Sequence, residues 1–300
     1  MKFLVTGGAG FIGSKLVNKL ILKNYHVVVI DNFSNSSGNR LNKSHDNLEI
    51  IKEDIRNIFS IKDRLNDIDG IFHQAALIDV KESFKKSDEY FDVNVNGTNE
   101  VFKLAEKLKV KTILASSSSV YGIAKTIPIK ENFQLKPISP YGLTKLENEI
   151  SMRKFWKKKI DIIALRYFNV FGIGQTPSYA GVITKFLERI RKNESPVIYG
   201  TGNQERDFIS VDDVAEINMM LMFSGIKKDV FNLGTGNSIK INDLAKIMIN
   251  ISEKKLQPIY ENEIIGDIKK SQADITKLKN KTNWNKFTPL KAGLKILFDQ

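Results

Sequence analysis

The sequence predicts an α/β fold: a doubly wound parallel sheet with a smaller, mixed α/β second domain. Two observations predict the sheet. Short β-rich runs alternate with amphipathic stretches through the first half, and a glycine-rich turn joins the first run to the first amphipathic stretch. Repeated strand–helix units form parallel sheets covered by helices on both faces, because their crossovers are right-handed. A third observation predicts the second domain, since this rhythm loosens after about Arg166.

The first strand and the first helix set the pattern. Residues 2–6 form a mainly apolar run, and between 11 and 23 the residues Ile12, Leu16 and Leu20 recur at the spacing of one helical face. The same patterns predict the other elements of the first half, in chain order: a strand at 26–30, a polar loop at 32–47, a strand at 48–54, a short helix near 58–65, a strand at 70–74, a long helix over about 88–108, a strand at 112–115, a helix from about 140 and a strand at 160–165.

Short glycine turns separate the elements of the second half. They lie at 199–202 and 233–236, and the apolar run 230–233 is suited to an extra strand of the sheet. Helices are expected near 183–192, 211–223 and 241–251, and the expected domains are a first domain at 1–167, rejoined by about 203–234, and a discontinuous second domain within 168–300.

The composition is that of an ordinary globular protein and argues against several classes of function. Of the 300 residues none is cysteine, which excludes disulfides and thiolate metal sites. The histidines, His26, His45 and His73, lack the spacing of metal ligands, so no metal is expected. The net charge of +12 comes from lysines spread among acidic residues, which argues against a nucleic-acid partner. The longest apolar runs are too short to span a bilayer, so we expect a cytoplasmic protein without a membrane partner.

The glycine-rich turn is typical of a dinucleotide site. Gly7, Gly10 and Gly13 lie between the first strand and the first helix, where glycine allows the backbone to approach a pyrophosphate at a helix N-terminus. Asp31 ends the second strand 18 residues after Gly13 and is suited to bind both adenosine ribose hydroxyls. A carboxylate there repels a 2′-phosphate, so NAD is expected rather than NADP. Asp54 and Ile55 end the third strand and are expected near the adenine.

Two Tyr-x-x-x-Lys pairs occur, and their contexts differ. Tyr121 and Lys125 lie in a loop with glycine and proline, so no helix fixes their geometry. Tyr141 follows Ser139-Pro140 at a helix start, which places Lys145 one turn further on the same face. The lysine charge favours the phenolate and would bring its pKa, ordinarily about 10, toward neutrality. The sequence therefore predicts that Tyr141 is a general base. The serines at 116–119 end the fifth strand, where ligands bind in this fold.

Taken in order, these motifs resemble the extended short-chain dehydrogenase/reductase family, in particular its NAD-dependent nucleotide-sugar 4-epimerases. The resemblance covers nearly the whole chain. It rests on the segments 6–13, 31–32, 73–76, 94–98, 116–122, 141–145, 165–169, 204–208 and 266–267. It implies a Rossmann-type fold and an isomerase that epimerises UDP-glucose and UDP-galactose, together with the N-acetylated pair UDP-GlcNAc and UDP-GalNAc, through a transient 4-keto sugar.

The resemblance also implies roles for individual residues. The catalytic group would be Ser117, Tyr141 and Lys145. The residues that would bind NAD are Gly7, Gly10, Phe11, Ile12, Asp31, Asn32, Asp54, Ile55, Gln74, Ala75, Ala76, Asn94, Ser116, Tyr141, Lys145 and Tyr167. The residues that would bind the UDP-sugar are Ser117, Ser118, Asn169, Val182, Val197, Tyr199, Arg206, Asp267 and Ser271.

Related reactions remain as alternatives. Relatives that act as 4,6-dehydratases carry Asp-Glu directly after the catalytic hydroxyl, and decarboxylases tend to carry Glu at the second of these positions. Here the two positions are Ser118 and Ser119, which cannot do that proton transfer. A uronic acid 4-epimerase stays open. An NAD-sensing protein without catalysis is hard to reconcile with an intact catalytic group.

The resemblance has one departure and two finer implications. Relatives usually carry Arg three residues before the late Asp267, where this chain has Ile264, so half of the expected phosphate clamp is missing unless Lys269 or Lys270 substitutes. The residue four past that Asp borders the sugar 2-substituent in the family, and the small Ser271 would leave room for an N-acetyl group. Relatives often form homodimers through a four-helix bundle, whose residues here would be Val101, Phe102, Ala105, Leu108, Leu146 and Ile150, unless these face the core.

Overall fold

The computed structural model describes residues 1–175, 181–264 and 266–300. The chain divides into two compact units. Unit 1 consists of Met1–Gly122, Gln134–Arg166 and Val214–Phe231, and unit 2 consists of Ile123–Phe133, Tyr167–Asp213 and Asn232–Gln300. The return of 214–231 to unit 1 makes both units discontinuous.

Unit 1 is built on a seven-stranded sheet with the strand order β10-β6-β5-β4-β1-β2-β3. The pairs β1–β2, β1–β4, β2–β3 and β4–β5 are parallel, which confirms the predicted doubly wound, Rossmann-type sheet. The strands are β1 (Lys2–Thr6), β2 (His26–Asp31), β3 (Leu48–Lys52), β4 (Gly70–His73), β5 (Lys111–Ser117), β6 (Ile162–Tyr167) and β10 (Asp229–Leu233).

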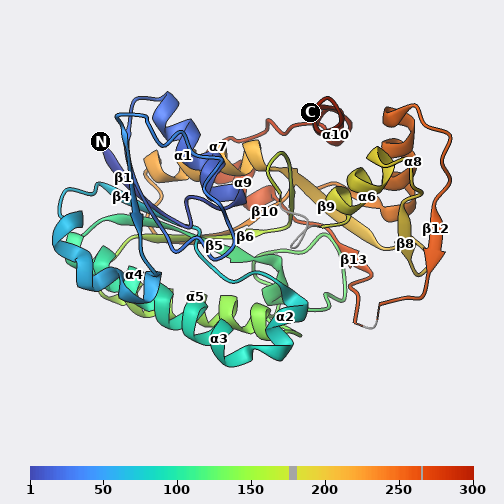
Figure 1. Cartoon of the computed structure of the whole chain (residues 1–300). Coiled ribbons are helices and arrows are strands. Elements are labelled where there is room, and N and C mark those ends of the chain that lie inside the picture. Colours follow the sequence, from blue (N-terminus) through green and yellow to red (C-terminus); the bar gives the residue numbers. More distant parts are fainter. Residues whose placement is uncertain (176–180, 265) are drawn as a thin grey trace. The chain divides into compact units, whose positions relative to one another are not determined.

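Helices cover both faces of this sheet. Figure 1 shows α1 (Phe11–Leu22) and α7 (Val211–Phe223) on one face, and α4 (Gly97–Leu108) and α5 (Pro140–Lys157) on the other. The remaining helical segments of unit 1 are η1 (Ile55–Leu65), α2 (Val80–Lys85), α3 (Ser87–Phe91), η2 (Asp92–Asn96) and η3 (Ser118–Tyr121). The single helix expected over 88–108 is therefore three segments, because a π-helical turn, η2, interrupts it. Such turns often occur at functional sites.

The residues expected to form a dimer bundle are mostly part of the core of unit 1. Val101, Phe102 and Ala105 are fully buried in the apolar cluster between the sheet and α4 and α5, and Leu108 packs against that cluster. The bundle expectation was wrong for these side chains, since the amphipathic face of α4 turns toward the sheet of its own chain. Ile150 on α5 is 41% exposed.

Unit 2 combines short strands with helices around a separate apolar cluster. In its main sheet β9 (Glu205–Ser210) pairs with β7 (Asn169–Phe171), β11 (Ser238–Lys240) and β13 (Lys270–Ser271), and β8 (Val197–Tyr199) pairs with β12 (Ile259–Glu261). Its helices are α6 (Val182–Arg191), α8 (Ile241–Ser252), α9 (Thr276–Thr282) and α10 (Leu290–Phe298). Among the described residues of either unit, no helix has both the length and the apolar character needed to cross a membrane.

Candidate active site

The glycine turn between β1 and α1 forms a backbone cradle. Gly7 has φ +66°, and a Cβ at this position would lie 2.7 Å from the backbone of Ala75. A Cβ on Gly13 would lie 2.1 Å from the Gly7 carbonyl oxygen. Gly10 is the N-cap of α1 and has no side chain to bind the first N–H groups of the helix. The turn therefore presents free N–H groups and the positive helix end, which suits a pyrophosphate.

Asp31 is fixed at the end of β2, beside this turn. Its Oδ2 accepts a hydrogen bond from the Ala9 N–H at 2.9 Å, and its Oδ1 accepts one from the Phe33 N–H at 2.8 Å. Burial raises the pKa of the Asp31 carboxyl, and the two backbone donors act against that rise. Each oxygen keeps a further lone pair for a ligand hydroxyl. The geometry fits a ribose and disfavours an added phosphate.

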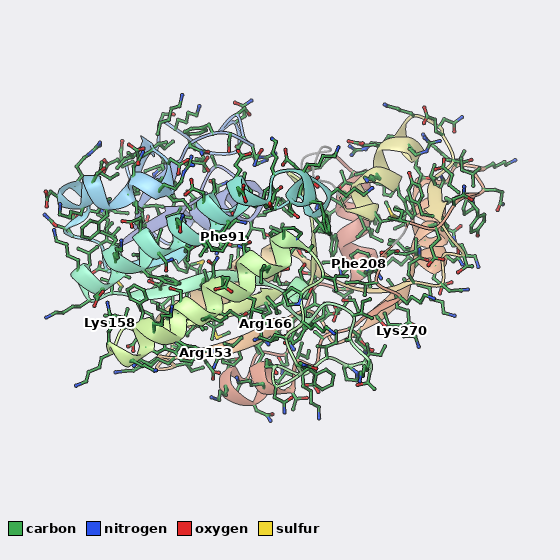
Figure 2. All side chains as sticks on the ribbon, turned by 90° about the horizontal axis from the view of Figure 1, so that it is seen from below. Phe91, Arg153, Lys158, Arg166, Phe208 and Lys270 are labelled. Carbon is green, nitrogen blue, oxygen red and sulfur yellow. The ribbon has the colours of Figure 1, made fainter. Side chains whose placement is uncertain are left out.

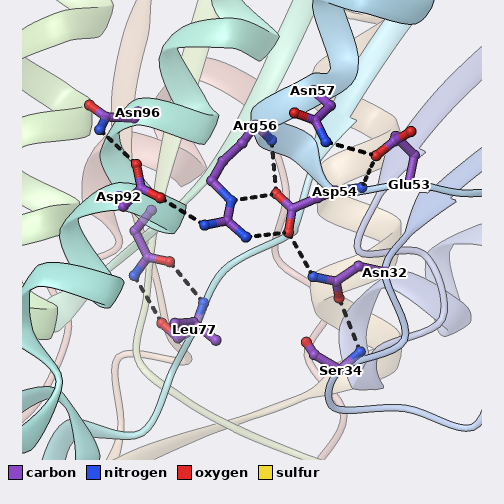
Figure 3. Close-up of polar contacts among 10 residues, drawn as sticks. Asn32, Ser34, Glu53, Asp54, Arg56, Asn57, Leu77, Asp92 and Asn96 are labelled. Atoms are coloured by element: carbon purple, nitrogen blue, oxygen red, sulfur yellow. Dashed lines mark hydrogen bonds and ion pairs between the residues drawn. The ribbon is translucent and has the colours of Figure 1, made fainter.

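The third strand end carries a charged cluster that the sequence reading missed in part (Figure 3). The guanidinium of Arg56 donates to both oxygens of Asp54 at 2.9 Å and to Asp92 in η2 at 2.7 Å. Asn32 donates to Asp54 at 2.9 Å, so the ends of β2 and β3 are linked. The hydrogen bond with Arg56 lowers the pKa of Asp54. Ile55, predicted near the adenine, has its side chain buried in the core.

A buried histidine connects the ends of β1 and β4 with the interrupted helix. Its Nδ1 lies 2.6 Å from Thr6 Oγ1, and its Nε2 lies 2.8 Å from Thr98 Oγ1. Thr98 donates its own hydrogen to the Asn94 carbonyl oxygen, so it accepts from His73 Nε2–H. Burial, and to a lesser degree the charge of Lys145, lowers the pKa of His73 to about 3. His73 is therefore neutral, with Nδ1 accepting from Thr6.

Asn94 lies in η2 and connects that turn to α5 through Thr144. Its side-chain amide donates to the Leu77 carbonyl at 2.9 Å and to Thr144 Oγ1 at 3.1 Å, and its oxygen accepts from the Leu77 N–H at 2.8 Å. Other predicted cofactor residues lie at the ends of strands and helices of unit 1. Ala75 and Ala76 follow β4, Gln74 donates to Asn218, and Phe11 and Ile12 open α1.

Tyr141 and Lys145 lie in the first turns of α5, as predicted. Ser139 caps the helix by accepting from the Gly142 N–H at 3.1 Å, and Pro140 occupies the first helical position. The Lys145 ammonium donates to the Ala115 carbonyl at 2.9 Å and lies 5.9 Å from the centre of the Tyr141 ring. Ser117, at the end of β5, is hydrogen-bonded to the Tyr141 hydroxyl.

The pKa values at this site differ from the sequence expectation. Burial raises the pKa of Tyr141 above its usual value, and the hydrogen bond from Ser117 acts against that rise. Burial also lowers the pKa of Lys145 to about 8. The lysine therefore does not bring the phenol toward neutrality in the protein alone, because its hydrogen bond goes to a carbonyl and desolvation outweighs its charge.

The other tyrosine of the two pairs has a different environment. The Tyr121 hydroxyl accepts a hydrogen bond from Arg166 at 2.7 Å and is buried, whereas the side chain of Lys125 is exposed. Arg166 also pairs with Glu149 on α5. Sequence reading missed Glu149, Arg166, Arg56 and Asp92. A signal existed for Glu149, since it lies four residues beyond Lys145 on the same helical face.

Unit 2 brings together three predicted substrate residues. Arg206 on β9 donates to Asp267 at 2.6 Å and to the carbonyls of Ile268 and Glu205, and Ser271 is its register partner on β13. Burial lowers the pKa of Arg206, and Asp267 opposes that effect. Three of its five N–H groups are used in these bonds, which leaves two for a ligand. Ser271 is buried.

The other predicted substrate residues of unit 2 are spread along several elements. Tyr199 and Ile264 line a cavity of about 640 Å³ together with Tyr260, Glu261 and Asn262. Asn169 donates to the Asp207 carbonyl, Val182 starts α6 and Val197 starts β8. Tyr167, which was predicted to bind the cofactor and not the substrate, ends β6 and is buried.

Comparison with known proteins follows the same motifs. The model of the NAD dependent epimerase/dehydratase family matches residues 3–234. A putative UDP-glucose 4-epimerase of Methanocaldococcus jannaschii is 37% identical, over 97% of this chain and 95% of that protein. The chain belongs to the NAD-dependent epimerase/dehydratase family. This membership confirms the resemblance to extended short-chain dehydrogenases and the expectation of NAD.

Solved structures agree with this family membership. A UDP-N-acetylglucosamine 4-epimerase from Methanobrevibacter ruminantium M1, in complex with UDP-N-acetylmuramic acid, has 38% identity and a TM-score of 0.94. The match covers 99% of this chain and 97% of that chain. A UDP-glucose 4-epimerase from Thermotoga maritima, with UDP-glucose, has 34% identity and a TM-score of 0.94 over 100% of this chain and 98% of that one.

Proposed function

We propose that this protein catalyses the NAD-dependent 4-epimerisation of a UDP-sugar: UDP-glucose and UDP-galactose, together with UDP-GlcNAc and UDP-GalNAc. The observation that carries the proposal is the group Ser117, Tyr141 and Lys145, which lies at the end of β5 and the start of α5 in the same unit as the glycine cradle. Family membership and the named relatives support the same reaction.

Tyr141 takes the proton of the sugar 4-hydroxyl and later returns it. Ser117 binds the same sugar oxygen, because its hydroxyl already lies against the Tyr141 phenol. Lys145, with a pKa of about 8, carries its charge 5.9 Å from the centre of the Tyr141 ring, where that charge opposes the larger effect of burial on the phenolate. The glycine cradle and Asp31 would hold NAD, which would supply the hydride acceptor that a reversible oxidation at C4 needs.

The side chains after Ser117 favour epimerisation over elimination. A dehydratase needs an acid and a base beyond the group that oxidises C4. Ser118 and Ser119 follow the catalytic hydroxyl, and Ser119 is hydrogen-bonded to Ser117 at 3.0 Å. A hydroxyl of ordinary pKa is a poor general acid or base near neutral pH. The 4-keto sugar is therefore expected to be reduced again rather than dehydrated.

Product NMR tests the proposed function. Purified protein is incubated with UDP-glucose, UDP-GlcNAc and the corresponding uronic acids, and the cofactor released by denaturation is identified. The proposal expects bound NAD and interconversion at C4 of the neutral or N-acetylated sugars. Conversion of the uronic acids alone would favour a uronic acid 4-epimerase, and loss of water would favour a dehydratase. Bound NAD without turnover would leave a binding protein.

The range of UDP-sugars that the enzyme accepts is expected to depend on Ser271. Its small, buried side chain is the register partner of Arg206, so a tyrosine here would occupy the space that we propose for the sugar 2-substituent. Ser271→Tyr is expected to abolish turnover of UDP-GlcNAc and UDP-GalNAc and to spare UDP-galactose, because overfilling a packed site costs about 1–3 kcal/mol or more. Initial rates on each sugar measure the effect. Wild-type protein that converts UDP-galactose but neither N-acetylated sugar would refute this assignment.

We also propose that the protein is a homodimer whose contact helices include α3 and α5. Phe84 and Phe91 on α2 and α3, and Leu143 and Ile150 on α5, are apolar side chains more than 40% exposed. Figure 2 shows α5 beside the teal helices on the same face of the sheet. Arg153, on α5, and Phe91, at the end of α3, are labelled there. Leu143 and Ile150 are seven residues apart and share one helical face. A second copy would cover them by twofold pairing of the same surface.

The mass of the protein in solution tests this dimer. Phe91→Glu combined with Ile150→Glu is expected to convert a dimer into a monomer in light scattering, because both charges would be buried in the contact. The matched control is Ile296→Glu on α10, since that side chain is 50% exposed but lies in unit 2. A wild-type protein that is monomeric at every concentration, or a control that dissociates equally, would contradict the proposed surface.

A further inference from the structure

Three consecutive residues at the end of β5 are each bound to a different turn of α5. The Ala115 carbonyl accepts from Lys145 at 2.9 Å, Ser116 Oγ donates to Glu149 at 2.6 Å, and Ser117 is hydrogen-bonded to Tyr141. The helix residues Tyr141, Lys145 and Glu149 are spaced by four and share one face. The proposed chemistry uses the first and second of these helix residues, and it leaves Glu149 without a role.

Glu149 forms a buried ion pair whose geometry is tightly specified. The Arg166 Nε donates to Glu149 Oε1 at 2.9 Å, and its Nη2 donates to Oε2 at 2.6 Å. Both side chains are 1% exposed. An apolar pair of similar volume is often as stable as a buried ion pair, because two charges must be desolvated. Stability alone is therefore a weak reason for charges here, and the fixed directions of a bidentate pair are the stronger one.

The same arginine reaches the chain on the other side of Ser117. Its Nη1 donates to the Tyr121 hydroxyl at 2.7 Å, and Tyr121 ends η3, the turn for which Ser117 is the N-cap. Ser116 before the catalytic serine and Tyr121 after it are thus joined through Glu149 and Arg166. The side-chain hydrogen bond to the end of β5 comes from Glu149 through Ser116, whereas the bond to Tyr121 lies further along the chain, at the end of η3.

We propose that Glu149, oriented by Arg166, is a positioning residue: it fixes the end of β5 through Ser116 and so sets the Ser117 hydroxyl against Tyr141. This inference rests on the proposed function, because it assigns Ser117 and Tyr141 to the reaction. The role is geometric. Glu149 exchanges no proton with the sugar, and its carboxylate stays bound to Arg166 and Ser116 throughout the reaction.

Glu149→Gln tests the proposal with a matched control. The amide keeps the shape of the side chain but loses the charge that holds Arg166. We expect kcat to fall on the order of 100-fold, as for a small displacement of reacting groups, with KM within about twofold and bound NAD retained. The control is Tyr121→Phe, which removes one bond from the same arginine but none from β5. It is expected to lower the melting temperature and to leave kcat within about twofold.

A second variant covers the case in which Glu149→Gln does not fold. Ser116→Ala keeps the ion pair and removes only the link to β5, and it is expected to lower kcat about tenfold with NAD content unchanged. In a Ser117→Ala background, Ser116→Ala is expected to add almost nothing, because the serine it positions is gone.

A readout without turnover separates this inference from the proposed function. The ultraviolet titration of the Tyr141 phenol, with Tyr141→Phe as the blank, is expected to move to higher pH in Ser116→Ala, since the bond from Ser117 that lowers its pKa is loosened. Active wild-type protein in which Ser116→Ala behaves like the Tyr121→Phe control, losing stability but keeping kcat and the same titration, would overturn the positioning role. If the wild-type protein is inactive but Ser116→Ala still shifts the Tyr141 titration, only the proposed epimerase function would be overturned.

Discussion

Tyr141→Phe is expected to lower kcat for UDP-sugar epimerisation by about 10²–10⁴-fold, the range for loss of a general base. The phenol oxygen is the group that moves the proton, and the ring is retained, so the fold and the bound NAD should be unchanged. KM for the sugar should change little. Steady-state kinetics, with cofactor content measured on the same sample, gives the answer.

The matched control is the other tyrosine of the two pairs. Tyr121→Phe loses a hydrogen bond from Arg166 and is expected to be less stable but active, because the Tyr121 side chain is buried and its hydroxyl is bonded to Arg166. If Tyr121→Phe were inactive and Tyr141→Phe active, the assignment of the base would be wrong.

Asp207→Ala is expected to lower the free energy of unfolding of unit 2 by about 3–5 kcal/mol. The fully buried carboxylate on β9 accepts from the N–H and Oγ1 of Thr235, from the N–H of Gly236 and from the N–H of Ala273, at 2.7–3.1 Å. Alanine would leave these donors without their acceptor and open a cavity. The midpoint of urea unfolding, followed by fluorescence, measures the loss.

Asp243→Ala is the control for that loss. Asp243 is exposed in the first turn of α8, where an acidic residue contributes about 0.3–1 kcal/mol through the helix dipole. Equal unfolding midpoints for the two variants would show that the hydrogen bonds from the loop at 234–236 to Asp207 contribute little to stability.

The order of strands and helices in unit 1 could be predicted because its signals are local. The run before Gly7, the turn at Gly7–Gly13 and the cap at Ser139 each follow from a few adjacent residues. The interruption at η2 could not be predicted in this way. The side chain of Asn94 is held there by Leu77 and Thr144, which lie 17 and 50 residues away in the chain.

The candidate site was predictable where one motif carries one function. Tyr141 and Lys145 lie on one helix, and their spacing gives their common face. Arg56, Asp92, Glu149 and Arg166 were missed because each acts through a charged partner on another element. The pKa of Tyr141 was misjudged for a related reason: spacing shows that Lys145 is near, but it does not show burial or the Ala115 carbonyl that takes the ammonium.

The hydrogen bonds through His73 all run in one direction. Thr6 donates to the imidazole, the imidazole donates to Thr98, and Thr98 donates to the Asn94 carbonyl. Reversing one bond would require both hydroxyls to rotate and the ring to change tautomer, so the three hydrogen bonds form and break together as one connection between the sheet and η2. Because the imidazole stays uncharged down to a pH of about 3, this connection does not change on acidification in the range where histidines usually titrate. Because burial lowers the pKa of Lys145 to about 8, that lysine rather than His73 is expected to respond to pH changes just above neutrality.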